Sequence, residues 1–294
     1  MSDTIVRGIT EDKYIRFFIV DSTDLTKKAV EMHHLSMTNT VLFGRILNAA
    51  LMLGADLKGE NESITVKVKG DGPSGGAVAT ANAKGEVKGY VYNPEVELPL
   101  TELRKDFNVK EALGKGMLSV IKDLGMKTPH TGQVELIYGT VAQDLTYYFA
   151  KSDQIPSSVG LGVLINPDGT VQRSGGFIIQ LMPDTPEDVI VKLENNLAVF
   201  PNLTDVMDMG YSIKKIISEM ILKGFGVKYT DEITAQFKCG CSESKMKQSL
   251  KLLPKEDLED IYNTQETVEV KCQYCNTAYI FKKDIVEKIL DQKS

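Results

Sequence analysis

The first 238 of the 294 residues contain no cysteine, and all four cysteines lie between positions 239 and 275. Tryptophan is absent, and only three histidines occur. A disulfide-stapled secreted domain is therefore excluded as the main architecture, because such domains carry cysteines throughout a short chain. The concentration of thiols near one end indicates a local site for metal or redox chemistry.

Long apolar runs and a secretion signal are also missing. The N-terminus lacks the basic-then-apolar order of a signal peptide. The most apolar stretch, residues 41–57, is interrupted by Arg45, Asn48 and Asp56 before it reaches membrane-spanning length. We therefore expect a cytoplasmic protein with no membrane partner. Thiols stay reduced in that compartment, which favours metal binding or redox switching over permanent disulfides.

A strong excess of positive charge is absent as well. The chain has 34 basic and 40 acidic residues, for a formal net charge of −6, and 42% of its residues are hydrophobic. This composition is typical of a soluble globular protein. The negative balance argues against nucleic acid as a partner.

Residues 1–183 predict one α+β domain. A helix over 36–58, capped by Ser36, carries apolar residues at helical spacing, and a second helix is expected at 141–150. Segments of alternating polarity between glycine- and asparagine-containing turns predict antiparallel strands. The expected strands are 64–69, 77–81, 86–92, 133–138, 161–165 and 176–182.

Residues 184–234 predict a helical linker. Thr185-Pro186-Glu187-Asp188 has the residues of a helix start, and a second helix is expected after Ser212. Its apolar residues recur at i, i+3, i+4, i+7 and i+8, and are Ile213, Ile216, Ile217, Met220 and Ile221. We expect this apolar stripe to pack on the first domain at rest. When uncovered, it would bind apolar surfaces of other proteins.

Residues 235–294 predict a small module with strands near 268–272 and 278–281 and helices near 254 and 283–290. Cys239 and Cys241 form a Cys-x-Cys pair, whereas Cys272 and Cys275 form a Cys-x-x-Cys pair on the turn between the strands. Four thiolates suit one tetrahedral zinc ion, which is favoured here over an iron–sulfur cluster. A module of this size has a small core, so the metal would supply much of its folding free energy.

The neighbouring thiolates of the Cys-x-Cys pair are one oxidation step from a disulfide. Loss of one pair would break the coordination, release the ion and remove the main support of the module. Spacing alone leaves a purely structural zinc knuckle as the alternative.

Other motifs give no catalytic pattern. Residues 70–76 are glycine-rich but lack the Gly-Lys-Ser/Thr ending of a phosphate loop, and they predict a hairpin turn. His33, His34 and His130 have no ligand or base spacing and are expected at the surface or in loops. Arg45, within an apolar helix, is expected to pair with a carboxylate or a carbonyl oxygen. We predict that the chain is not an enzyme.

The cysteine pattern, preceded by Gly224-Phe-Gly, resembles that of the bacterial redox-regulated holdase family, the heat-shock chaperones activated by oxidative stress. Weaker similarities follow in the family's order over nearly the whole chain. They are Gly44-Arg45, Gly70-Asp-Gly-Pro, Gly85-x-Val-x-Gly-Tyr, Ser152-x-Gln-x-Pro and Gly175-Gly-Phe-Ile-Ile-Gln.

This resemblance implies an N-terminal α+β core (1–183), a metastable helical linker (184–234) and a zinc-binding redox-switch domain (235–294). It implies that the reduced, zinc-bound form is inactive. Oxidation would pair Cys239 with Cys241 and Cys272 with Cys275, release zinc and unfold the last domain. The oxidised form would dimerise and hold unfolding client proteins without ATP, with the apolar stripe as the candidate client-binding surface.

Two rival functions use the same cysteines. A zinc-ribbon module that binds nucleic acid would need net positive charge, but residues 239–294 contain nine lysines, no arginine and ten acids. A thiol-disulfide oxidoreductase would place Cys-x-x-Cys at a helix start, whereas a β-turn is expected here.

Overall fold

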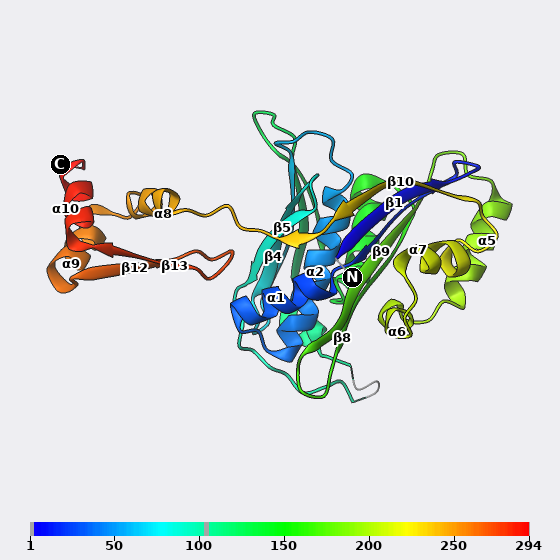
Figure 1. Ribbon diagram of the computed structural model, residues 1–294, viewed down its shortest axis with the longest axis horizontal. Helices are drawn as coiled ribbons and strands as arrows, with labels where there is room; N and C mark the ends of the chain where they lie inside the picture. The colour runs from blue at the N-terminus through cyan, green and yellow to red at the C-terminus, as the bar shows by residue number, and fades with distance from the viewer. Residues whose placement is uncertain (1–2, 103–105, 294) are drawn as a thin grey trace. The chain divides into compact units, whose positions relative to one another are not determined.

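The computed structural model describes residues 3–102 and 106–293, and the chain divides into two compact units, 1–238 and 239–294. The first unit contains two sheets around a central helix, and the second is a small α+β unit (Figure 1). Strand pairing is antiparallel except for one short parallel pair. The predicted α+β class is confirmed. The assignment of 184–234 as a separate metastable linker stays a prediction.

The first sheet of the first unit has five antiparallel strands. In spatial order these are β10 (Val227–Thr234), β1 (Thr4–Thr10), β2 (Ile15–Asp21), β9 (Val171–Leu181) and β8 (Ser157–Ile165). The outer strands β10 and β8 come from parts of the chain more than 60 residues apart. The sheet is therefore assembled from strands that are distant in the sequence.

The second sheet has six strands. In spatial order these are β11 (Gln236–Phe237), β5 (Glu86–Val91), β4 (Gly76–Asn82), β3 (Ser63–Gly70), β6 (Gly116–Asp123) and β7 (His130–Glu135). The β3–β4 pairing makes residues 70–76 a hairpin connection, as predicted.

Helix α2 (Met37–Gly54) contacts strands of both sheets and is buried along nearly its whole length. The Ser36 hydroxyl accepts the Asn39 N–H at its start, as the cap predicts. A helix that is apolar on all sides belongs in a core between two layers. Arg45 of this helix donates to the Thr140 carbonyl oxygen at 3.4 Å, which confirms its expected backbone partner, and burial lowers the pKa of its guanidinium.

The remaining helices of the first unit lie on the two sheets or at their edges. They are α1 (Thr23–His33), α3 (Val109–Leu113), α4 (Ala142–Tyr148) with the π-helical turn η1 (Phe149–Asp153), α5 (Glu187–Ala198), α6 (Leu203–Asp208), and α7 (Ile213–Lys215) with the π-helical turn η2 (Ile216–Ile221).

The last strand pair of the first unit leads directly to the cysteines. Phe237 of β11 is buried, and its ring lies 6.1 Å from that of His33, which also stacks edge-on against Phe43. The Lys238 N–H donates to the Val87 carbonyl oxygen at 2.8 Å, one residue before Cys239.

The second unit consists of three helices and a hairpin. They are α8 (Glu243–Leu250), α9 (Lys255–Thr264), β12 (Thr267–Lys271), β13 (Ala278–Lys282) and α10 (Lys283–Asp291). The predicted strands and helices of this module are present.

Three expectations are corrected. The strand expected at 133–138 is β7 at His130–Glu135, because the N–H groups of Ile137 and Tyr138 turn away to the Asp144 carboxylate, at 2.9 Å each. The helix expected after Ser212 is mostly π-helical, with the Leu222 N–H bound to the Ile217 carbonyl oxygen. His33 is buried between two aromatic rings and not at the surface.

Candidate metal centre

The Cys-x-x-Cys pair lies on the turn of the β12–β13 hairpin, as predicted. The Cys272 carbonyl oxygen accepts N–H groups from Cys275 at 3.2 Å and from Asn276 at 2.7 Å, while the Cys272 N–H donates to the Thr277 carbonyl oxygen at 2.9 Å. Asn276 adopts a left-handed conformation with φ of 56°, which tightens the turn. These bonds fix the backbone that carries the two buried sulfurs.

The Cys-x-Cys pair lies just before α8. The Ser242 hydroxyl accepts the Lys245 N–H at 3.3 Å and so caps this helix. The Lys245 ammonium then reaches back to the Gly240 carbonyl oxygen at 2.6 Å. The first turn of helix α8 therefore fixes the position of Gly240, which lies between Cys239 and Cys241.

The four sulfurs meet in one cluster. Cys239 Sγ lies 3.7 Å from Cys272 Sγ, and Cys241 Sγ lies 3.4 Å from Cys275 Sγ. All four Sγ atoms lie within 4.8 Å of one another. The structure thus brings together every predicted cysteine ligand, although the two pairs are more than 30 residues apart in the chain.

This donor set fits a zinc ion. Sulfurs placed about 2.3 Å from a tetrahedral zinc lie roughly 3.8 Å from one another, close to the spacing found here. Thiolate ligands also suit other soft metals, so the four sulfurs could hold a metal ion, but their geometry does not identify which one.

The thiols differ in their affinity for protons. Burial raises the pKa of Cys239 to about 12 and also raises the pKa of Cys272. Burial acts in the same direction on Cys275, but hydrogen bonds from the Thr277 hydroxyl and N–H, together with those from the neighbouring thiols, lower its pKa to about 7. A cation in the centre would favour the thiolate at all four positions.

Two polar neighbours of the cluster were missed by sequence reasoning. Tyr279 Oη lies 3.1 Å from Cys241 Sγ, and Thr277 Oγ1 lies 3.2 Å from Cys275 Sγ. A signal for Tyr279 was present, because it is two residues from buried Phe281 on the same strand and so shares its face. Hydrogen bonds of this kind orient metal ligands.

The second unit has a small apolar core, which would stabilise it weakly if no metal linked its cysteines. Its core contains six buried side chains, with partly buried neighbours around them. They are Leu250, Leu258, Val268, Phe281, Val286 and Ile289. A structural metal site would therefore contribute a large share of the folding free energy of this unit.

The apolar stripe lies in the first unit, in a core with β2, β9 and the helices of the 184–226 segment. Ile213, Ile216, Ile217 and Ile221 are buried, and Met220 is partly buried against them. Phe17 and Ile19 of β2 belong to the same core. The stripe therefore packs against the first sheet within the first unit, as we expected for the protein at rest.

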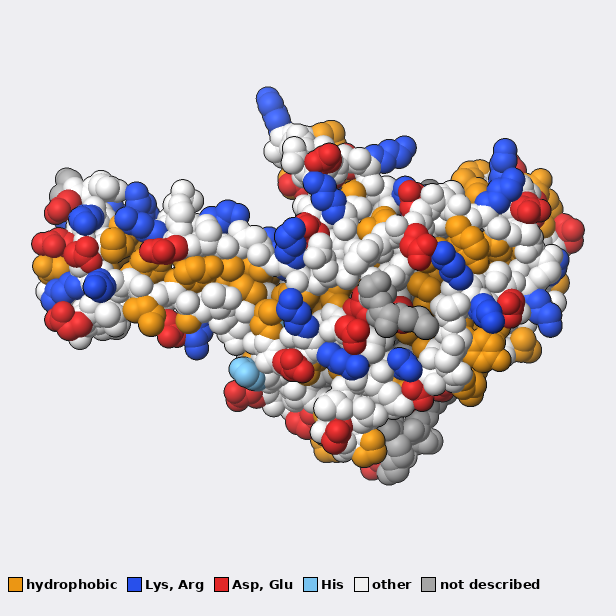
Figure 2. Space-filling model, viewed as in Figure 1, with side chains coloured by type: hydrophobic (Ala, Val, Ile, Leu, Met, Phe, Trp, Pro, Cys, Tyr) orange, Lys and Arg blue, Asp and Glu red, His pale blue; other side chains and the backbone are white. Residues whose placement is uncertain are grey.

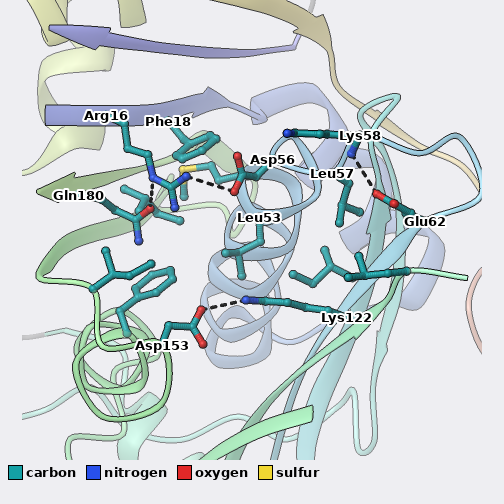
Figure 3. A pocket seen from close by; sticks show the side chains of 16 residues that line it. Arg16, Phe18, Leu53, Asp56, Leu57, Lys58, Glu62, Lys122, Asp153 and Gln180 are labelled. Carbon is teal, nitrogen blue, oxygen red and sulfur yellow. Dashed lines mark hydrogen bonds and ion pairs between the residues drawn. The ribbon is translucent and has the colours of Figure 1, made fainter. Parts of the chain in front are cut away.

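A separate pocket of about 330 Å³ opens near the C-terminal end of α2 (Figure 3). Its rim carries the ion pair of Arg16 with Asp56 at 3.4 Å and that of Lys122 with Asp153 at 2.9 Å. The Gln180 side chain accepts from Arg16 at 2.8 Å. These charged groups neutralise one another, and the pocket has no nucleophile–base pair among its described lining residues.

Comparison with known proteins decides the family. A family model described as Hsp33 protein matches residues 3–282. The chain belongs to the Hsp33 family. It is 46% identical over 289 residues to a 33 kDa chaperonin of Agathobacter rectalis, covering 98% of this chain and all of that protein. It is 41% identical over 294 residues to a 33 kDa chaperonin of Clostridium perfringens, covering 100% and 93%.

The fold is also that of a solved Hsp33 homologue. A crystal structure of the 33 kDa chaperonin of Thermotoga maritima aligns with a TM-score of 0.93 at 36% identity, covering 100% of this chain and 99% of that one. The relatives are named as chaperonins, a non-enzymatic class, in agreement with the prediction that the chain is not an enzyme. Among the described residues, no helix combines the length and the apolar character needed to span a bilayer.

Proposed function

We propose that this Hsp33-family chain is a cytoplasmic, redox-regulated holdase that binds unfolding proteins under oxidative stress without ATP. The observation that carries the proposal is the convergence of all four thiols on one site in a unit with a small core. Oxidation of these thiols alters the principal cross-link of that unit. Redox state and folding are therefore coupled.

In the resting state Cys239, Cys241, Cys272 and Cys275 would hold one zinc ion as thiolates. Bound by these residues, the ion would cross-link the segment before α8 to the β12–β13 turn. Structural zinc contributes on the order of 10 kcal/mol to small domains at neutral pH. The second unit remains folded while the four sulfurs are reduced.

Activation is a two-electron oxidation for each disulfide. Two thiolates give two electrons to one hydrogen peroxide, which takes up two protons from solvent and is reduced to two waters, and one S–S bond forms. Two peroxides and four protons from solvent therefore convert the four thiolates into two disulfides, Cys239–Cys241 and Cys272–Cys275. Disulfide sulfurs no longer act as thiolate ligands, so the second unit loses its cross-link and unfolds.

The pairing within each motif needs a rearrangement of the sulfurs. The sulfur–sulfur contacts of 3.7 Å and 3.4 Å in the folded site run between the motifs and join residues 33 and 34 positions apart. Once the unit loosens, chain entropy favours closure of the shorter loops. Peptide mapping of the oxidised protein should therefore recover Cys239–Cys241 and Cys272–Cys275, and pairs between the motifs would contradict this step.

We further propose that the 184–226 segment contributes to client binding in an oxidised homodimer. The stripe is buried against the first sheet, so these helices must leave the sheet before Ile216 or Ile217 can contact a client. The same segment already exposes Val199 at 82% and Met209 at 74%. Hydrophobic side chains gather on the surface over α5 and α6 (Figure 2).

A paired assay tests the proposal. Zinc release and suppression of the aggregation of a heat-unfolding enzyme are measured before and after peroxide with mild heat. We expect both signals to rise together, and dithiothreitol with zinc to reverse them. Full holding activity in the reduced, zinc-bound form would reject the switch. Tight binding of single-stranded nucleic acid at physiological salt would instead favour a zinc-ribbon function.

A further inference from the structure

Strand β8 is an edge strand of unusual composition. It forms one border of the first sheet and pairs on its other side with β9. Its sequence, SSVGLGVLI, contains no charged residue and no proline over nine residues. All nine residues are half-buried and so remain partly accessible to solvent.

The outward backbone groups of β8 can be assigned from the ladder. The Leu181 N–H donates to the Pro156 carbonyl oxygen at 3.0 Å, so residue 156 forms a hydrogen-bonded pair with β9. Hydrogen-bonded and non-hydrogen-bonded pairs alternate along an antiparallel ladder. Ser158, Gly160 and Gly162 therefore bond to β9. The residues with N–H and C=O directed to the free edge are Ser157, Val159, Leu161 and Val163.

Within residues 3–102 and 106–293, no backbone group pairs with these outward groups. An exposed edge of this kind can add a further strand, and proteins usually protect it with charges, proline or short length. The other three edges of the two large sheets have such protection. Strand β10 carries Lys228, Asp231 and Glu232, β7 carries Glu135, and β11 has only two residues.

We propose that the free edge of β8 binds an extended, uncharged segment of an unfolded polypeptide by strand addition. Four residues offer alternating donors and acceptors, which matches about seven residues of an incoming strand. Main-chain hydrogen bonds recognise a backbone whatever its sequence. The lack of charge at this edge leaves apolar segments free to approach. This inference rests on the proposed holdase function for the source of the unfolded segment.

Proline at position 159 provides the sharpest test. Val159→Pro removes an N–H that points to the free edge and leaves the β8–β9 hydrogen bonds in place. Val159→Ala is the matched control, because it also loses the valine side chain but keeps the N–H. Both full-length variants are first compared for thermal stability and for zinc release on oxidation, which should match.

Binding is then measured with a reduced, carboxymethylated polypeptide that cannot refold. We expect the affinity of oxidised Val159→Pro to be at least about tenfold below that of Val159→Ala, from the loss of one hydrogen bond and the clash of the ring. In the wild type, the amides of Leu161 and Val163 should gain protection from deuterium exchange when the polypeptide binds. The exchange measurement tests the edge even where the proline variant folds poorly.

Equal affinities for the two variants, with no protection of Leu161 and Val163 in either redox state, would overturn the inference. Protection that rises with the concentration of the protein alone would also overturn it, because a second copy would then occupy the edge. An oxidised wild type that protects these amides but does not prevent client aggregation would support the edge and reject the holdase proposal.

Discussion

Asp3 illustrates how a single buried acid makes the first unit sensitive to pH. Its carboxylate accepts the N–H groups of Asp24, at 3.1 Å, and of Leu25 at the start of α1. Burial raises the pKa of Asp3 to about 6, against the opposing effect of these two bonds, and the nearby Asp21 and Asp24 add to the rise. The folded protein therefore binds this proton more tightly than the unfolded chain does.

Protonated Asp3 should therefore add to the free energy of unfolding. This stabilisation is at its maximum below about pH 4 and is lost as the pH rises to about 6. Asp3→Asn removes this titration. We expect the stability of the wild type relative to Asp3→Asn to fall across this window and to stay constant above it. Urea unfolding followed by circular dichroism measures the difference. Glu194→Gln, at an exposed acid, is the control, and a parallel decline there would contradict the assignment.

Tyr279 is the residue-scale test of the metal centre. Its hydroxyl lies 3.1 Å from Cys241 Sγ, so Tyr279→Phe removes one polar contact without removing a ligand. Loss of such an outer hydrogen bond lowers metal affinity by about 10-fold to 100-fold. Competition with a chromogenic zinc chelator measures the change. Tyr262→Phe, whose hydroxyl lies near Glu287 in the same unit, should bind zinc like the wild type; equal affinities of all three proteins would exclude a role for Tyr279.

At the scale of elements, the apolar stripe is buried by contacts with other strands and helices of the first unit. Residues Ile216–Ile221 form a π-helical turn, which is rare and often found at functional sites. Their cover includes residues of β1, β2 and β9 and of the preceding helices. Release of the stripe is therefore a detachment of helices from a sheet.

Ile217→Ala should weaken this attachment by about 2–5 kcal/mol, as for other buried isoleucines. We expect the reduced, zinc-loaded variant to hold clients measurably better than the reduced wild type, because its helices leave the sheet more often. Light scattering of an aggregating client, with zinc content measured in parallel, checks this. Met126→Ala, at a 61% exposed position outside the 184–226 segment, should change neither property. A destabilised but inactive reduced Ile217→Ala would separate the stripe from client binding.

At the scale of the whole molecule, the chain contains two units that depend on different forces. The first unit has a large apolar core without any cysteine, whereas the second has a six-residue core beside the four thiols. Removal of the metal should therefore affect the two units differently.

A zinc chelator applied under reducing conditions should abolish slow amide exchange in β12 and β13 and leave that of β1, β2 and β9 unchanged. Hydrogen exchange read by mass spectrometry resolves the two units. Readdition of zinc should restore protection, because no thiol has been oxidised. Retention of slow exchange in β12 and β13 without metal would show that the second unit folds on its own core, against the proposed mechanism.

Local patterns were sufficient for several parts of this molecule. The spacing of the cysteines predicted a metal site, and the periodicity around Ile217 predicted an apolar helical face. The cap at Ser36 and the apolar residues after it predicted α2. The cap, the apolar face and the spacing within each cysteine pair depend on residues close together in the chain, so sequence alone determined them. The convergence of the two cysteine pairs, 33 and 34 positions apart, depends on the fold.

The tertiary structure decided what distant segments do to one another. No strand was assigned to β1, β2 or β10, and the pairing of β1 with β10 joins residues more than 200 positions apart. The burial of His33 depends on Phe237, and the position of Tyr279 at the cluster depends on how α8 brings Cys241 to the hairpin. Likewise, only the order of the first sheet leaves β8 at an edge. Such features follow from non-local contacts, whose free energy depends on partners that a local pattern does not specify.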